Sequence, residues 1–64
     1  MIVLGIDPGT ATTGYGVVSG DGTRPPTLIE CGVIRTRPRE ALPDRLLEIH
    51  SSVTELIARH RPHA

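Results

Sequence analysis

Asp7 is the residue of this chain best placed to do chemistry. It stands at the end of an uncharged apolar run, residues 1–6, and directly before Pro8 and Gly9. A carboxylate that follows such a strand lies at the mouth of an open sheet, where α/β proteins place ligands and catalytic groups. Threonines and glycines follow closely, which favours a metal or phosphate site. The alternative is structural, because Asp-Pro-Gly is also typical of an Asx turn.

No other acidic residue of the chain is expected beside Asp7. Asp21 falls in a loop at the opposite end of the predicted hairpin, roughly 20 Å away at about 3.3 Å per residue. Glu40 and Asp44 lie at the same end as Asp7, but about 10 Å away because two strand spacings intervene. Asp7 is therefore the only candidate in the chain for a catalytic, metal-binding carboxylate.

Three strands and one helix must position Asp7. The continuous apolar run of residues 1–6 predicts a strand buried on both faces, in the middle of a sheet. Residues 14–19 predict a second strand, antiparallel to the first because the connection is short. Residues 27–36 predict a third strand after a loop rich in glycine and proline.

Side-chain alternation assigns faces to the second and third strands. Tyr15 and Val17 share one face of the second strand. In the third strand, Ile29, Cys31 and Val33 alternate with a glutamate and a glycine, which predicts that these three form its drier face. Tyr15 is interpreted as a packing residue, because it is the only aromatic residue in the sequence.

A helix is predicted to begin at Pro43, where the missing N–H costs nothing, and to end at about His60. Pro62 then prevents its continuation. An i,i+4 ion pair is expected between Glu55 and Arg59. Apolar residues at helical spacing predict the face that packs on the sheet: Leu46, Ile49, Val53, Leu56 and Ile57.

Length and composition limit the chain to one small domain. A domain of 64 residues has a thin core,. Cys31 is the single cysteine, so no internal disulfide forms, and one free thiol fits a reducing compartment. No signal peptide or membrane-spanning run is apparent, and we predict a cytoplasmic protein. Seven basic residues balance seven acidic ones, so net charge does not indicate a partner.

One helix cannot cover a strand that is apolar on both faces. A helix of about 16 residues is about 24 Å long, enough to return the chain to the other end of the sheet. The next strand is then expected beside the first and parallel to it. Residues 1–64 are therefore expected to form an incomplete α/β domain with a mixed sheet, in which three antiparallel strands and a helix precede a fourth strand.

Four short stretches of sequence resemble the RuvC family of Holliday junction resolvases. GIDPG at residues 5–9, followed after three residues by TGYGV at residues 13–17, resembles that family's N-terminal signature. CGVI at residues 31–34 and LPDRL at residues 42–46 also resemble its third strand and first helix. The resemblance implies an RNase H-like fold, in which residues 1–64 are the N-terminal, incomplete part of a single nuclease domain.

The resemblance also implies an activity. RuvC proteins are Mg²⁺-dependent endonucleases that resolve Holliday junctions by paired symmetric strand cuts in DNA recombination and repair. Asp7 matches the first carboxylate of a site expected to hold two Mg²⁺ ions. The other carboxylates, beginning with a glutamate on the next strand, fall beyond Ala64, so residues 1–64 alone are expected to be inactive. The implied partners are four-way junction DNA, a second copy in a homodimer, and the branch-migration proteins RuvA and RuvB.

The basic residues indicate a function less clearly than Asp7 does. Arg35, Arg37 and Arg39 cluster on the Asp7 side, where they could contact DNA phosphates. A solvated loop is the stronger interpretation, since no aromatic residue is interleaved and Glu40 follows. The remaining groups have no zinc-site spacing and are interpreted as surface groups that compensate the helix dipole: His50, His60, Arg61 and His63.

Other function classes share part of this pattern. Actin-like ATPases and sugar kinases use a strand, an acidic turn and a strand around nucleotide phosphates, which Asp7, Gly9 and Thr10 would suit, but they need a longer chain with a second such turn. RNase H-like nucleases of pre-ribosomal RNA begin similarly but usually lack this combination of Pro8 and Tyr15. A binding module or a non-catalytic remnant is the third alternative, which a 64-residue product that bound DNA without cutting would support.

Overall fold

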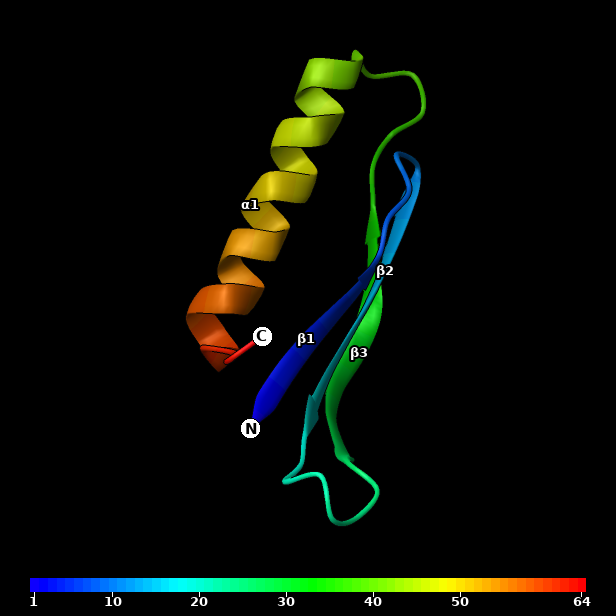
Figure 1. The fold of residues 1–64 in the computed structure, drawn as a ribbon. Helices are drawn as coiled ribbons and strands as arrows, with labels where there is room; N and C mark the ends of the chain where they lie inside the picture. Colours follow the sequence, from blue (N-terminus) through cyan, green and yellow to red (C-terminus); the bar gives the residue numbers. More distant parts are fainter.

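The computed structural model describes all 64 residues as a three-stranded antiparallel sheet with one helix along one face (Figure 1). β1 covers Ile2–Asp7, β2 covers Thr12–Ser19 and β3 covers Thr27–Arg35, in the sheet order β1-β2-β3. α1 follows at Leu42–His60. The order predicted from the sequence is confirmed, with the difference that β1 extends to include Asp7.

Strand register separates the sheet into two faces. Asp7 pairs with Gly14, and Gly14 with Val33, whereas the neighbouring row pairs Ile6 with Tyr15. Side chains of successive residues point to opposite faces, so these two rows face opposite ways. Tyr15 borders the same cleft as residues of α1. We call that side the helix face and the side of Asp7 the outer face.

β2, rather than β1, is the central strand, and the prediction that β1 is buried on both faces is wrong for these residues. Ile6 is exposed although it lies on the helix face, and Gly5 and Asp7 on the outer face are exposed as well. The free edge of β1 is nevertheless occupied at its start. The His63 N–H donates to the Ile2 carbonyl at 2.8 Å, and the Leu4 N–H donates to the Ala64 carbonyl at 2.9 Å. The chain after α1 therefore begins to run beside β1 in the parallel sense, as predicted.

The covered face of β3 is also the opposite of the predicted one. Ile34 on the helix face is buried, together with Val17 of β2 and Leu56 of α1. Cys31 and Val33, predicted to lie on the drier face, are exposed on the outer face, and Ile29, which falls at an irregularity in the register, is exposed as well. Alternation correctly separated the two faces of β3, but the position of α1 decides which of them is covered.

α1 has the predicted boundaries within one residue. It begins at Leu42, with Pro43 in its first turn, and ends at His60. Arg61 then adopts a left-handed conformation with φ 47°, and its N–H donates to the Ile57 carbonyl at 2.8 Å. A left-handed residue closes the last turn of a helix, and the proline that follows prevents continuation.

The contact between α1 and the sheet is narrower than the apolar face of the helix. Leu56 is the only buried residue of α1, while Ile57 and Leu46, both predicted to pack, are about half exposed. Ile6 on the helix face of the sheet is exposed too, so neither surface is fully covered by the other. Only five residues of the 64 are buried, and two of those are threonines, Thr13 and Thr36.

The structure contains no helix with the length and hydropathy of a membrane-spanning segment.

Candidate functional site

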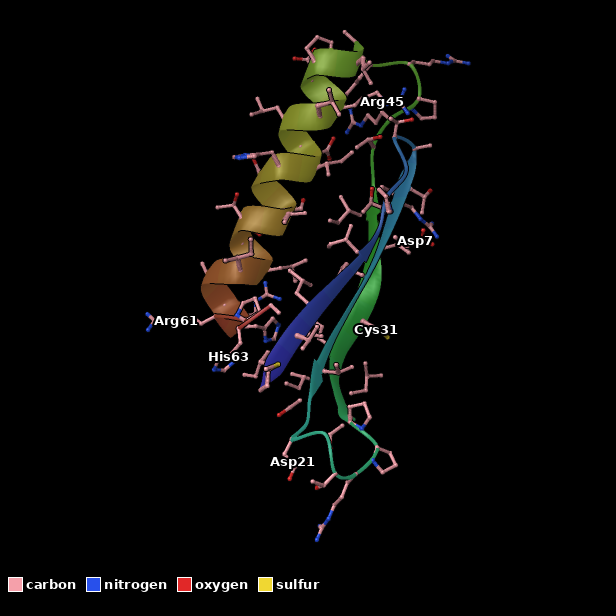
Figure 2. The ribbon with its side chains drawn as sticks, viewed as in Figure 1. Asp7, Asp21, Cys31, Arg45, Arg61 and His63 are labelled. Atoms are coloured by element: carbon pink, nitrogen blue, oxygen red, sulfur yellow. The ribbon has the colours of Figure 1, made fainter.

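Asp7 closes β1 on the outer face, on the side of the sheet away from α1 (Figure 2). A Cβ placed on its partner Gly14 would lie 3.7 Å from the Asp7 Cβ, so glycine leaves room beside this side chain. The exposed carboxylate accepts no hydrogen bond and joins no ion pair. In an Asx turn it would accept the Gly9 N–H, but that N–H donates to Thr13 Oγ1 at 3.3 Å. The Asx-turn alternative is therefore wrong, and the carboxylate is free to bind a ligand.

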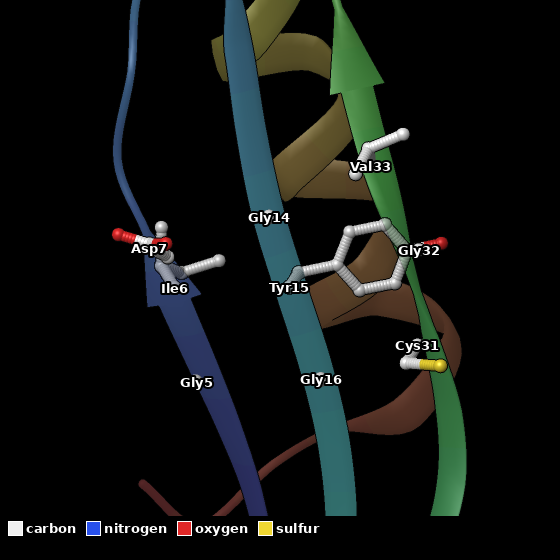
Figure 3. A pocket seen from close by; sticks show the side chains of 9 residues that line it. All are labelled: Gly5, Ile6, Asp7, Gly14, Tyr15, Gly16, Cys31, Gly32 and Val33. Atoms are coloured by element: carbon white, nitrogen blue, oxygen red, sulfur yellow. The ribbon is translucent and has the colours of Figure 1, made fainter.

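A shallow trough of about 690 Å³ crosses the outer face, and Asp7 borders it (Figure 3). On this face it is bounded by Gly5, Gly14 and Gly16 together with Asp7, Cys31 and Val33. A Cβ added to Gly16 would meet nothing within 4 Å. The glycines thus expose the backbone of β1 and β2 beside the carboxylate. That another element or DNA approaches this backbone closely stays a prediction.

The turn that follows Asp7 is held by hydrogen bonds to the hydroxyl of Thr13. Thr13 Oγ1 donates to the Gly9 carbonyl at 2.6 Å and accepts from the Gly9 N–H. Both polar backbone groups of Gly9 are therefore bonded to one side chain, which is itself buried. A Cβ on Gly9 would overlap the Thr12 carbonyl oxygen, so the turn needs glycine here for space.

A second set of hydrogen bonds holds the same turn and comes from Thr36, which is in turn bonded to Arg45 at the start of α1. Thr36, directly after β3, donates its hydroxyl to the Thr10 carbonyl and its N–H to the Ala11 carbonyl, the latter at 3.1 Å. Arg45 Nε donates to Thr36 Oγ1 at 3.2 Å. Nothing in the spacing of these residues indicates that they meet, since Thr36 and Thr10 are separated by 26 positions.

Asp21 and Glu40, two of the acidic residues considered as neighbours of Asp7, have partners of their own. Asp21 caps the loop at the far end of the hairpin, where its carboxylate accepts from the Thr23 hydroxyl at 2.7 Å and N–H at 2.9 Å. These bonds lower the pKa of Asp21. Glu40 lies 3.8 Å from Arg37 Nε, which agrees with the solvated-loop interpretation of the arginines. Arg35 does lie on the Asp7 side, paired with Thr12 at the end of β3.

Glu30 is the centre of a polar cluster that no pattern in the sequence indicated. Its carboxylate accepts from Tyr15 Oη at 2.8 Å, lies 2.7 Å from His60 Nε2, and accepts from Arg59 Nη1 at 3.2 Å. Two predictions are corrected by this cluster. Arg59 pairs with Glu30 rather than with Glu55, and His60 is a mostly covered partner of β3 rather than a surface group. The cluster fastens the end of α1 to β3.

His63 is likewise more than a surface group. Its Nδ1 accepts a hydrogen bond from the Ile2 N–H at 3.0 Å, beside the backbone bond that the His63 N–H makes to Ile2. Two hydrogen bonds therefore seat the end of the chain against the start of β1. His63 is exposed, as predicted for a surface group, and its ring in addition bonds to the start of β1.

Glu30 predicts a pH dependence of stability. The hydrogen bond from His60, and then that from Tyr15, lower the pKa of Glu30 from 4.5 to about 2. A carboxyl whose pKa is depressed by folding stabilises the fold above its unfolded pKa, and this contribution is lost as the pH falls towards the folded value. Glu30→Gln in the full-length protein should therefore lower the melting temperature at pH 6, and its difference from wild type should shrink between pH 4.5 and pH 2. Thermal unfolding followed by circular dichroism measures this.

The matched control is Glu55→Gln, because Glu55 is exposed and makes no ion pair. It should leave the melting temperature unchanged over the same pH range. A Glu30→Gln protein that melted with wild type at pH 6 would show that the cluster contributes no stability.

Asp7 suits a hard divalent cation as one ligand but not as a complete site. Mg²⁺ prefers oxygen ligands, and the unpartnered Asp7 carboxylate supplies two oxygens on an open surface. No group of three His, Cys, Asp or Glu side chains in the chain could hold a metal ion. The donor chemistry fits, and further ligands are needed.

Comparison with known proteins gives a consistent result. Residues 3–64 match the family model described as "Crossover junction endodeoxyribonuclease RuvC". The chain is 50% identical over 62 residues to the protein of that name from Chlorobium phaeovibrioides and 55% identical over 62 residues to that from Salinispora arenicola. Each match covers 97% of this chain but only 33% and 35% of the relatives. The chain therefore spans about a third of their length.

Solved structures agree with the sequence matches. The structure described as "T. thermophilus RuvC in complex with Holliday junction substrate" superposes with a TM-score of 0.92 at 41% identity, covering 100% of this chain and 39% of that one. A second Thermus thermophilus RuvC structure gives a TM-score of 0.84 at 39% identity, covering 97% of this chain and 41% of that one. The strands and helix of residues 1–64 thus have the arrangement found in those proteins.

Proposed function

Because the chain belongs to the RuvC family of crossover junction endodeoxyribonucleases, we propose that its 64 residues form the N-terminal part of one RNase H-like nuclease domain. The domain would resolve four-way DNA junctions by paired, symmetric strand cuts. These residues alone supply a single candidate ligand, Asp7, and would not cut DNA. The family match favours this reading over an ATPase or a sugar kinase.

The observation that carries the proposal is the free carboxylate of Asp7 at the carboxyl end of β1, facing an open trough. We assign Asp7 as a catalytic carboxylate that binds Mg²⁺. When bound, a pair of such ions activates water and stabilises the leaving oxygen in phosphodiester hydrolysis. The part played by this chain is to hold one negatively charged ligand at a fixed place beside an exposed backbone surface.

The register beside β1 indicates where a second ligand would come from. Ala64 accepts from Leu4, and the chain there runs parallel to β1. Parallel neighbours advance together at about 3.3 Å per residue, so a strand continued in this register reaches the level of Asp7 about three residues later. We propose that the glutamate expected on that strand stands there, next to Asp7.

The proposed partners follow from the reaction. Two symmetric cuts need two sites, while each chain would supply one, so a homodimer with a two-fold axis is the simplest arrangement. Four-way junction DNA is the substrate, and RuvA and RuvB are the branch-migration partners that the family implies. Contacts from Arg35, Arg37 and Arg39 to DNA phosphates stay a prediction. A single free thiol, Cys31, fits a cytoplasmic location.

Metal removal tests this function directly. The full-length protein, given an end-labelled synthetic four-way junction and Mg²⁺, should produce two nicks at symmetric positions, and excess EDTA should abolish them because the carboxylates alone cannot activate water. Linear duplex of the same sequence is the control substrate and should stay intact. Cleavage that survived EDTA, or equal cutting of the linear duplex, would contradict the proposal, and junction-independent ATP hydrolysis would favour the ATPase class.

A further inference from the structure

We propose that Thr36 and Arg45 are positioning residues for Asp7, acting through the turn of residues 8–11. The proposal rests on the proposed function, because it concerns the same carboxylate. Neither residue lies on the outer face with Asp7. They act from the helix face and from the start of α1, through the backbone that leaves β1.

The hydrogen bonds of Thr36 have a fixed direction. A hydroxyl has one proton to donate and can also accept. Arg45 Nε is a donor only, so its bond to Thr36 Oγ1 uses the acceptor side of that oxygen. The hydroxyl proton is thereby directed to the Thr10 carbonyl, while the Thr36 N–H holds the Ala11 carbonyl. Thr36 is buried, so water does not readily replace these bonds.

These bonds complete the fixation of the turn. On one side Asp7 is held by its pairing with Gly14, and on the other it precedes Pro8, which restricts its backbone to extended conformations. Thr13 holds both polar groups of Gly9, and Thr36 holds the two residues after it. Gly9, Thr10 and Ala11 are therefore all bonded to Thr13 of β2 or to Thr36, directly after β3.

Arg45 serves here through its geometry rather than its charge. It joins no ion pair, and its bond to Thr36 is made by Nε, an atom that lysine lacks. Because Arg45 lies in the first part of α1, its bond also connects the helix to the turn. Lysine at this position would keep the charge but put a methylene group where Nε donates to Thr36, which removes the bond in its present geometry and separates the two contributions.

The experiment compares variants of the full-length protein. Thr36→Val and Arg45→Lys remove the proposed bonds, and Thr36→Ser should restore them. The matched controls are Thr27→Val, at the far end of β3, and Arg24→Lys, in the loop at the far end of the hairpin; both residues are exposed. For each protein, hydrogen exchange of a peptide covering residues 8–13, Mn²⁺ affinity without DNA, junction affinity and kcat for cleavage are measured below its melting temperature.

Thr36→Val and Arg45→Lys should exchange faster in residues 8–13 and bind Mn²⁺ more weakly. A misplacement of about 1 Å at a reacting centre costs roughly 100-fold in rate, so we expect kcat to fall by roughly 10- to 100-fold while junction affinity stays the same. Thr36→Ser and both controls should behave as wild type. If Thr36→Val does not fold, Arg45→Lys decides the question.

The inference would be overturned if Arg45→Lys showed the hydrogen exchange, Mn²⁺ affinity and kcat of the wild type. It would also be overturned if the melting temperature of the variant fell while these three properties did not change. Failure of the wild-type protein to cut junctions would instead overturn the proposed function. The exchange measurement does not depend on cleavage, so the two failures are distinguishable.

Discussion

Asp7→Asn in the full-length protein should reduce junction cleavage by roughly 1000-fold or more, since metal ions contribute several kcal/mol to the transition state and each 1.36 kcal/mol is tenfold in rate. Asparagine keeps the size of the side chain and one oxygen but removes the negative charge that the cation requires. Junction binding should survive, because the carboxylate makes no contact that supports the fold. Single-turnover cleavage and gel-shift titration measure the two effects separately.

Asp21→Asn is the matched control, because Asp21 lies at the opposite end of the hairpin and only caps its own loop. It should cut at the wild-type rate. If Asp7→Asn lost junction binding together with cleavage, Asp7 would be mainly structural. If it kept the wild-type cleavage rate, Asp7 would not be a ligand of the reacting metal.

Gly9→Ala should have the second largest effect. The added methyl group would overlap the Thr12 carbonyl oxygen, and backbone on both sides of the turn must move to admit it. Such a shift would break the bonds between Gly9 and Thr13 and displace Asp7. A misplacement of about 1 Å costs roughly 100-fold in rate, so kcat should fall by about that factor, and the melting temperature should fall as well. A time course of junction cleavage and a thermal unfolding curve measure these changes.

Gly20→Ala is the control for this substitution. A Cβ there meets Pro26 at 3.4 Å, an ordinary contact, and Gly20 lies at the far end of the hairpin. Its rate and melting temperature should stay close to wild type. Wild-type cleavage by Gly9→Ala would show that the turn tolerates movement without displacing Asp7.

Several features of the fold and the site were predictable from sequence because they depend on neighbouring residues. An apolar run that ends at Asp7 and is followed by Pro8 and Gly9 determines where the first strand stops. Pro43 and Pro62 limit the helix by removing an N–H and restricting the backbone. The location of Asp7 at a strand end, its distance from Asp21, and the return of the chain to the free edge of β1 all follow from the lengths of these elements.

Other features depended on contacts between distant segments. Alternation in β3 separates Ile34 from Cys31, but it does not tell which of the two faces α1 will cover. The partner of Arg59 could not be read from helical spacing, because Glu30, 29 positions away, offers a carboxylate that also binds His60. Thr36 likewise meets Thr10 only because the register between β2 and β3 brings the ends of those strands together.

The sequence by itself therefore determined the elements, their order and the place of Asp7 at a strand end, because each follows from the chemistry of adjacent residues. Only the tertiary structure decided which face of the sheet is covered and which side chains fasten the turn behind Asp7. Those outcomes depend on where α1 crosses the sheet and on hydrogen bonds between segments far apart in the chain, and neither leaves a periodic pattern in the sequence.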